Sequence, residues 1–150
     1  MTDAPELPEL EPEGVRLTRR FAATAEDTFD AWVEPEVMKL WMFAGDSGQI
    51  VRVENDPIVG GELSILEHRN GEDVDHYGAY LELDRPTRLA FTLEVPWHFE
   101  GVTEVGVDIT PTAQGCELQF AQDGVERATT EGDWLAMFDR LEEVLRERQA

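Results

Sequence analysis

Three histidines and one glutamate are the side chains of this sequence best suited to chemistry. Histidine changes charge near neutral pH, and the three are His68, His76 and His98. Alternation along residues 62–68 predicts a strand on which Glu67 faces inward and His68 faces outward. A carboxylate in an apolar interior has a raised pKa, and could serve as an acid, a base or an anchor for a polar ligand group. The alternative for Glu67 is an ion pair with an arginine.

The orientation of the strand that carries His76 is open. His76 and Tyr80 fall on one side of residues 74–83, where an imidazole and a phenol could contact a ligand together. The other side is more apolar and could equally face inward; it holds Tyr77, Ala79, Leu81 and Leu83. His98 lies in a loop, where it could stand at a cavity mouth or simply face solvent.

Patterns typical of catalytic and cofactor sites are missing from the sequence. There is no Gly-x-Ser-x-Gly elbow, no histidine pair at metal-ligand spacing, and the Gly60-Gly61 pair stands outside any phosphate-binding pattern. Cys116, the one cysteine, cannot form an internal disulfide, and we expect it to be an inert strand residue. We therefore predict no metal, no cofactor and no catalytic residue.

Net charge is the strongest compositional signal. The chain has 150 residues and a formal charge of −21, and its bases are eleven arginines and one lysine. Such an acidic surface repels phosphate backbones and anionic lipids, so nucleic acid and membrane partners are disfavoured. A salt-rich cytoplasm would favour this composition, and a coding bias toward arginine would also contribute. The sequence does not separate the two.

Length and the N-terminal segment indicate one domain in the cytoplasm. Residues 1–13 are acidic and rich in proline, and we expect a disordered tail there. We expect residues 14–150 to form one domain. The sequence has no secretion signal and no apolar run long enough to span a bilayer, which predicts a cytoplasmic protein.

From residue 15 onward the sequence predicts a strand, two short helices, six strands and a long helix. The first strand spans Val15 to Phe21, and the short helices begin near Thr24 and Pro35. Alternating segments then follow at residues 49–55, 62–68, 74–83, 88–95, 101–110 and 115–122. In the first of these, Val51 and Val53 are predicted to share a face. The short connections predict hairpins, and hence an antiparallel sheet in an α+β fold.

The last segment, Thr129 to Arg148, predicts a long amphipathic helix. Its apolar residues recur at steps of three and four, and they are Trp134, Phe138, Leu141 and Leu145, with Leu135, Met137 and Val144 beside them. We expect Thr130 to cap the helix, with Glu131 and Asp133 in the first turn. The apolar face of the sheet would then be buried against this helix.

Several phrases of the sequence resemble the START-like, birch-pollen-allergen-like superfamily, and within it the bacterial homologues of the C-terminal domain of the heat-shock-90 ATPase activator. They are residues 19–32, Pro35-Glu36, Trp41, residues 59–63, residues 77–92 and residues 132–135. The resemblance implies a helix-grip fold, in which a curled seven-stranded antiparallel sheet surrounds the C-terminal helix. It also implies an elongated cavity between the two, although members of this superfamily differ in ligand, chemistry and partner.

The resemblance and the many large aromatic residues together lead us to expect a binding protein for a small hydrophobic molecule, lipid-like or aromatic. The predicted cavity residues are Trp41, Glu67, His76, Tyr80, Phe91, Phe120, Trp134 and Phe138. A dry interior of interlocking rings is the alternative for the aromatic members of this set. Two other functions stay open, an enzyme of the cyclase, dehydratase or hydrolase kind and a stress-related or chaperone-related module with a protein partner. We expect a monomer or a homodimer.

Overall fold

The structure is a computed structural model, and it describes residues 14–43, 48–95 and 101–149. The predicted tail at residues 1–13 and the side chains of Trp97, His98 and Phe99 lie outside the described residues. The elements are β1 (Val15–Phe21), α1 (Ala25–Asp30), α2 (Pro35–Trp41), β2 (Gly48–Asn55), β3 (Glu62–Arg69), β4 (Glu72–Asp84), β5 (Arg88–Leu93), β6 (Thr103–Thr112), β7 (Gly115–Asp123) and α3 (Arg127–Gln149). The predicted order of strands and helices is confirmed.

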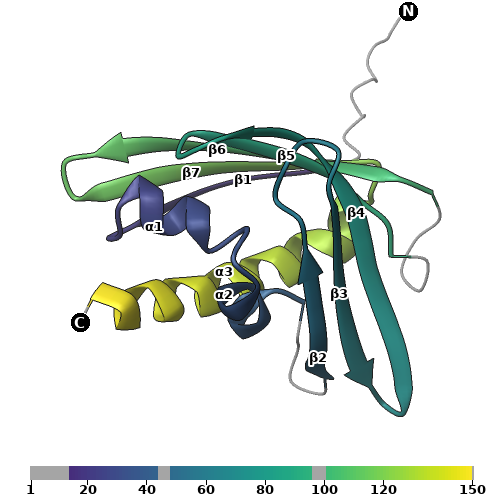
Figure 1. Ribbon diagram of the computed structural model, residues 1–150. Coiled ribbons are helices and arrows are strands. Elements are labelled where there is room, and N and C mark those ends of the chain that lie inside the picture. The colour runs from purple at the N-terminus through teal and green to yellow at the C-terminus, as the bar shows by residue number, and fades with distance from the viewer. Residues whose placement is uncertain (1–13, 44–47, 96–100, 150) are drawn as a thin grey trace, which may run out of the picture.

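The seven strands form one antiparallel sheet in the order β1-β7-β6-β5-β4-β3-β2. Neighbours in the chain are neighbours in the sheet from β2 to β7, as the short connections predict, and β1 joins the far side of β7. The β3–β4 hairpin turns at Asn70 and Gly71, whose φ values of 54° and 82° fit the left-handed region that a tight hairpin requires. Figure 1 shows α3 running beneath the sheet.

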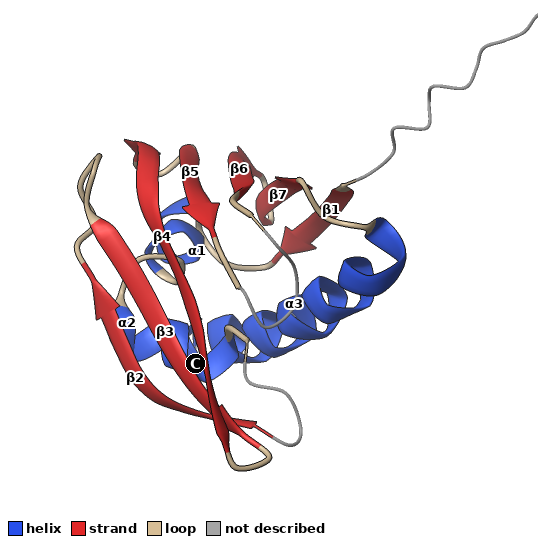
Figure 2. Cartoon of the chain, turned by 90° about the vertical axis from the view of Figure 1, so that its right-hand side faces the viewer, coloured by secondary structure: helices blue, strands red, loops and turns tan. Residues whose placement is uncertain are grey.

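The sheet curves around α3, and its two halves face different sides of the helix (Figure 2). β4 passes from one half to the other: residues 80–84 pair with β5, while residues 72–79 pair with β3. Bulges accompany the curvature, one between Tyr80 and Glu82 and one between Ile50 and Arg52. The bulge in β2 makes the prediction for Val51 wrong: Val51 is 51% exposed, while Val53 packs against the core.

β4 turns its more polar side inward, which settles the orientation that the sequence left open. His76 and Tyr80 are each 2% exposed, and Leu81 is 44% exposed. The bulge after Tyr80 then shifts the alternation, so that Leu83 packs against the core as well. Counting in steps of two fails along this strand because the bulge inserts one extra residue.

The two short helices begin at the predicted signals. The Thr24 side chain accepts a hydrogen bond of 3.0 Å from the backbone N–H of Asp27, which caps α1. Pro35 stands at the first position of α2, where its missing N–H has no cost. In Figure 1, α1 lies below β6 and β7 toward the C-terminal end of α3, and α2 lies beside the middle of α3.

The long helix α3 begins earlier than predicted. Its first residue is Arg127, so Thr130 is inside the helix rather than at its cap, and the first turn holds no acidic residue. The prediction of an acidic first turn is therefore wrong. The chain enters α3 directly after the end of β7, because Gly124 has a φ of 93° and Val125 is buried. The apolar stripe is confirmed, with Trp134, Met137, Phe138, Leu141 and Leu145 buried; Leu135 is 42% exposed.

A cluster of aromatic rings fills the core, with Trp32 at its centre. The Trp32 ring centroid lies 4.8–6.3 Å from the centroids of five neighbours, which are Trp41, Phe91, Phe120, Trp134 and Phe138. None of the six side chains is more than 3% exposed. Two of these contacts are edge-to-face, two are stacked and one is tilted, and this part of the interior is closely packed.

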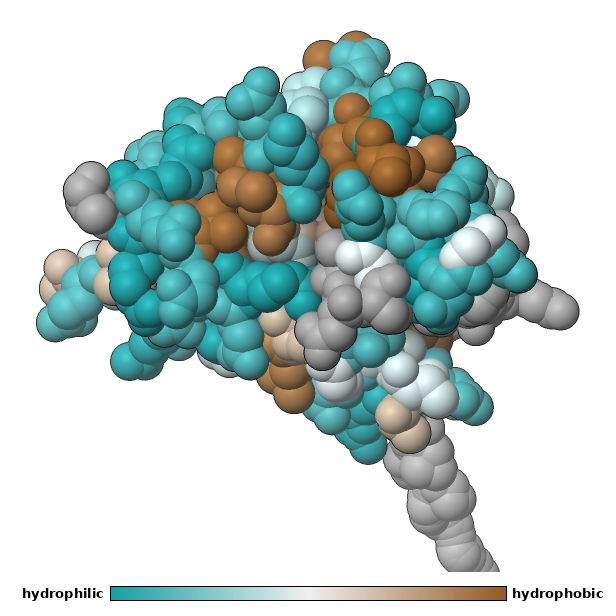
Figure 3. All heavy atoms as spheres, turned by 90° about the horizontal axis from the view of Figure 1, so that it is seen from below, coloured by the Kyte–Doolittle hydropathy of each residue, from teal (hydrophilic) through white to brown (hydrophobic). Residues whose placement is uncertain are grey.

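The outer surface is mostly polar. The face seen from below in Figure 3 is hydrophilic over most of its area, with separate apolar patches. Within the described residues, no helix is both long enough and apolar enough to cross a membrane.

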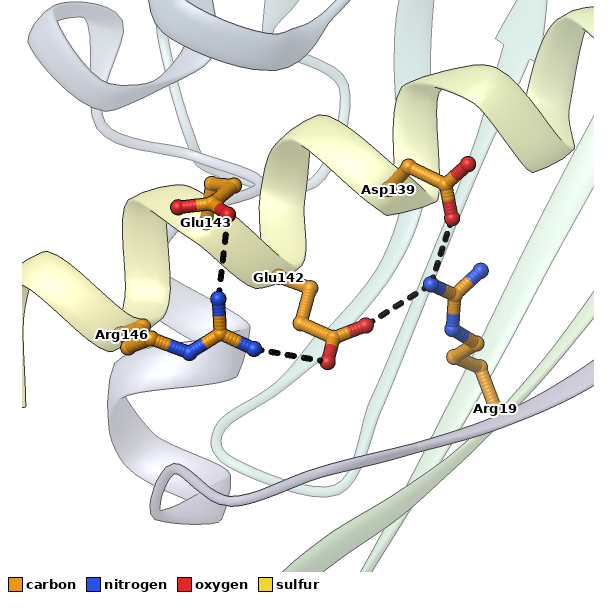
Figure 4. Close-up of polar contacts among 5 residues, drawn as sticks. All are labelled: Arg19, Asp139, Glu142, Glu143 and Arg146. Carbon is orange, nitrogen blue, oxygen red and sulfur yellow. Dashed lines mark hydrogen bonds and ion pairs between the residues drawn. The ribbon is translucent and has the colours of Figure 1, made fainter.

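Ion pairs fix the C-terminal half of α3 against β1. The Arg19 guanidinium donates to Asp139 at 2.7 Å and to Glu142 at 2.8 Å, and Arg146 donates to Glu142 at 3.1 Å and to Glu143 at 3.0 Å. Figure 4 shows these residues as one connected network along the helix. The Arg19 side chain is 24% exposed, but those of Asp139 and Glu142 are 72% and 41% exposed, so solvent screens these pairs in part.

Candidate functional site

A pocket of about 560 Å³ lies beside the N-terminal half of α3. Its walls come from the end of α2, the β3–β4 hairpin, the last residues of β5, the end of β7 and the first turns of α3. The lining residues are Phe43, Arg69, His76, Leu93, Val95, Gln122, Gly124, Val125, Glu126, Thr129, Thr130, Asp133, Trp134, Ala136, Met137 and Arg140. The wall is apolar where β5 faces α3 and polar toward β3 and the first turns of the helix.

Three polar residues from the β3–β4 hairpin form a buried cluster at the pocket. Glu67 is fully buried, and both of its oxygens accept hydrogen bonds from Arg69, at 3.0 Å from Nε and 2.8 Å from Nη2. His76 Nε2 lies 3.7 Å from Glu67 Oε1. A two-point contact of this kind fixes the guanidinium and the carboxylate in one plane, so Glu67 holds the Arg69 side chain in place.

The strand beside this cluster leaves room for the carboxylate. Gly48 of β2 pairs with Arg69 of β3, and a Cβ atom at Gly48 would overlap Oε2 of Glu67. Glycine therefore allows Glu67 to turn toward β2 and meet Arg69 there. The His76 ring is oriented from its other side, because Nδ1 lies 3.1 Å from the carbonyl oxygen of Ile65. A carbonyl oxygen only accepts hydrogen bonds, so Nδ1 carries the hydrogen.

The Phe43 ring packs between the rings of His76 and Trp134, and all three line the pocket. Its ring stacks on His76 with centroids 4.1 Å apart and an interplanar angle of 14°, and it meets Trp134 edge-on at 5.7 Å. Its φ of 63° is uncommon for an aromatic residue. The backbone N–H of Phe43 donates to Sδ of Met137 at 3.1 Å. Packing against α3 and β4 thus holds the backbone of Phe43 in a strained conformation.

A chain of hydrogen bonds fixes the orientation of the Trp134 indole. Its Nε1–H donates to Oε1 of Gln122 at 2.8 Å, Nε2 of Gln122 donates to Thr103 at 3.0 Å, and the Thr103 hydroxyl donates to the Leu93 carbonyl at 2.7 Å. Gln122 and Thr103 are each 1% exposed. Because each buried polar group has a partner, the chain fixes the indole at the pocket wall without a desolvation penalty.

The structure divides the predicted cavity residues into two groups. His76 and Trp134 line the pocket, and Glu67 lies next to it behind Arg69. The other five do not line this pocket, because they pack in the core around or beside Trp32; they are Trp41, Tyr80, Phe91, Phe120 and Phe138. Their rings pack around or beside Trp32, while the pocket lies nearer to the start of α3.

Arg69, Gln122 and Phe43 line the pocket but were not among the predicted site residues. The signal for two of them was present: Arg69 follows Glu67 by two residues, and Gln122 follows Phe120 by two, so each shares the inward face of its neighbour. Phe43 offered no such signal, because its position depends on a left-handed backbone after α2.

Tyr80 and Cys116 are buried in the core. The Tyr80 hydroxyl donates to Asn55 Oδ1 at 2.7 Å, and burial raises the pKa of Tyr80 to about 12. Burial also raises the pKa of the Cys116 thiol, which donates to the Thr28 hydroxyl. A buried, protonated thiol is a poor nucleophile. No three His, Cys, Asp or Glu side chains in the described part of the chain are arranged to hold a metal ion.

A curved antiparallel sheet closed around one long C-terminal helix, with two short helices after the first strand, defines the α+β helix-grip class. The chain belongs to the family described as "Activator of Hsp90 ATPase homolog 1-like protein", whose model matches residues 22–146. The resemblance read from the sequence is therefore confirmed. A search of curated proteins found no match.

Solved structures from several bacteria share the fold. A crystal structure of a Chromobacterium violaceum protein has a TM-score of 0.81 at 22% identity, covering 89% of this chain and 97% of that one. An AHSA1-like protein from Aeromonas hydrophila, solved by NMR, has a TM-score of 0.79 at 19% identity, with coverages of 91% and 94%. A Staphylococcus aureus protein of unknown function has a TM-score of 0.78 at 18% identity, again with coverages of 91% and 94%. At these identities the likeness concerns the fold alone.

Proposed function

We propose that the protein binds a small, largely apolar molecule in the pocket between α3 and the sheet. The observation that carries this proposal is a pocket with an apolar wall on one side and, on the other, Arg69 and His76 backed by the buried Glu67. Leu93, Val95, Val125 and Met137 provide the wall. The cluster is Glu67, Arg69 and His76. Such a combination is typical of ligand sites, where apolar contact gives affinity and a few polar groups set the orientation.

The size of the pocket suits this role. A volume of about 560 Å³ lies within the range of small-molecule sites, roughly 300–1,000 Å³. Burial of about 200 Å² of apolar ligand surface would contribute roughly 5 kcal/mol, at about 25 cal/mol per Å². This contribution alone corresponds to a dissociation constant of roughly 0.2 mM. Association and ordering costs weaken the binding further, so a tighter complex requires polar contacts as well.

Native mass spectrometry and thermal unfolding test the proposal together. Protein purified without detergent is expected to carry a small molecule, or to melt at a higher temperature with members of a lipid and aromatic library, because a ligand of the folded state alone stabilises it. A spectrum with no adduct, together with unchanged melting across the library, would remove the proposal.

A pair of variants on one helix localises the site. Ala136 lines the pocket and is exposed, so Ala136→Trp is expected to fill the pocket without disturbing the core and to weaken ligand binding at least about tenfold, which corresponds to about 1.4 kcal/mol. Ala128→Trp is the matched control, because Ala128 is exposed on the same helix and is not part of the lining. Equal affinities for the two variants, measured by calorimetry, would place the ligand elsewhere.

A further inference from the structure

The guanidinium of Arg69 presents hydrogen-bond donors to the pocket. Arginine has five N–H groups, and the described residues engage two of them, both through Glu67. The other three belong to a side chain that lines the pocket and is 21% exposed. A ligand oxygen that enters the pocket can therefore accept a hydrogen bond from Arg69 while the ion pair with Glu67 stays intact.

The charge of Arg69 is already compensated. Glu67 faces it at 2.8 Å with no exposure to solvent. The other charged residues of the lining are one base, Arg140, and two acids, Glu126 and Asp133, and the whole chain has a charge of −21. The site thus has no excess of positive charge to offset the free-energy cost of desolvating a bound anion. At the Arg69 end of the pocket a cation would lie next to the guanidinium, and like charges side by side are unfavourable.

We propose that the molecule bound here is uncharged and has an acceptor oxygen, such as a carbonyl, that Arg69 binds, with an apolar body against Trp134 and Met137. This inference rests on the proposed function and narrows its ligand to one chemical class. It excludes fatty acid anions and long-chain amines as preferred ligands, although their hydrocarbon chains are as apolar as the body of the proposed ligand.

A matched series of naphthalenes tests the class on the unaltered full chain at pH 7. The four probes share one ring system and differ in the group at position 2: acetyl, ethyl, carboxylate and aminomethyl. By calorimetry, the acetyl compound is expected to bind at least about tenfold more tightly than the ethyl compound, since a hydrogen bond to a charged donor contributes at least that much. The carboxylate and ammonium compounds are expected to bind more weakly than the acetyl compound.

The outcomes separate the two proposals. If the carboxylate or the ammonium compound binds best, the inference about the ligand class is overturned and the proposed function stands. If the acetyl and ethyl compounds bind equally, Arg69 does not act as a donor and the inference again fails. If none of the four binds, this inference fails, and the proposed function is then decided by the mass spectrum and the library melting experiment.

A double variant assigns the preference to Arg69. Glu67→Met combined with Arg69→Met removes both charges, so that no unpaired ion is left buried. It is expected to abolish the preference for acetyl over ethyl while ethyl binding stays within about twofold. The control is Arg20→Met with Glu117→Met, which removes an ion pair of the same residue types from β1 and β7, outside the lining; it should keep the preference. A double variant that keeps the full preference would overturn the inference.

Discussion

Tyr80 illustrates how burial of one residue couples stability to pH. It is 2% exposed and donates to Asn55, and its pKa is about 12 because burial disfavours the phenolate. In the unfolded chain a tyrosine has its ordinary pKa near 10. Below that value the phenol is protonated in both states and its full contribution to stability is present. Between about pH 10 and 12 the unfolded state loses the proton first, so the contribution is lost as pH rises.

We predict that the free energies of unfolding of the unaltered protein and of Tyr80→Phe cross at alkaline pH. At pH 7 the variant should be less stable by about 1 kcal/mol, because it lacks the hydrogen bond to Asn55. From about pH 10 to 12 the unaltered protein should lose about 2–3 kcal/mol more than the variant, at about 1.4 kcal/mol per unit of pKa shift. Urea unfolding at a series of pH values measures both curves.

Tyr77→Phe is the control for this experiment, because Tyr77 lies on the same strand and is only partly buried. It should change the pH dependence less than Tyr80→Phe does. Parallel curves for Tyr80→Phe and the unaltered protein would show that Tyr80 ionises equally in both states.

Single residues of the site were predictable where strand alternation is regular. Glu67 was correctly placed inward, and the same step of two leads to Arg69. The distance from His76 to Glu67 was beyond such reasoning, because it depends on the register of β3 against β4 and on a bulge farther along β4. Which aromatic rings line a pocket and which fill the core depends on how Trp32 packs, and the sequence holds no local signal for that.

At the scale of elements, α3 has a stabilised half and a pocket-forming half. Arg19 of β1 joins Asp139 and Glu142 in the C-terminal half, and the hydrogen bonds to these carboxylates raise the pKa of Arg19. The N-terminal half, up to Arg140, provides one wall of the pocket.

We predict that Arg19→Gln lowers the free energy of unfolding by about 1 kcal/mol at low salt. The variant loses two charge-assisted hydrogen bonds and leaves Asp139 and Glu142 as neighbouring like charges. Arg20→Gln is the control, since Arg20 points to the opposite face of β1 and is largely exposed, and its cost should stay within about 0.5 kcal/mol. Equal losses for the two variants would mean that the network of Figure 4 does not stabilise α3.

The elements themselves were largely predictable, since hydrophobic periodicity and turn residues agree along most of the chain. The hairpin at Asn70-Gly71 and the cap at Thr24 are local signals, and both appear in the structure. The errors arise where tertiary structure overrides local pattern. Val51 faces solvent because of a bulge, and α3 starts at Arg127 because β7 leads directly into it.

At the scale of the whole molecule, the sequence has 33 acidic residues and 12 basic ones. Repulsion among these like charges is therefore the dominant long-range electrostatic contribution to stability. Added salt weakens that repulsion, and it also weakens the ion pairs of Arg16, Arg19 and Arg88. Because acids far outnumber bases, screening of the repulsion should prevail.

We predict that the melting temperature rises by about 5 °C or more between about 0.05 M and about 0.5 M sodium chloride. Differential scanning calorimetry measures the change. Sorbitol at matched osmolality is the control, because it lacks charge and isolates the electrostatic part. A melting temperature that falls or stays constant with salt would show that the attractive pairs balance the excess of acids.

The division of α3 into two halves has a practical consequence for protein engineering. The α3 residues that line the pocket lie between Thr129 and Arg140, whereas Phe138 packs against Trp32, and Asp139 and Glu142 bind Arg19. In the proposed ligand site, specificity could therefore be redesigned by exchanging exposed side chains such as Thr129, Asp133 and Ala136, with the stabilising contacts unchanged. The same separation would let natural variants of the proposed site change their ligand at little cost in stability.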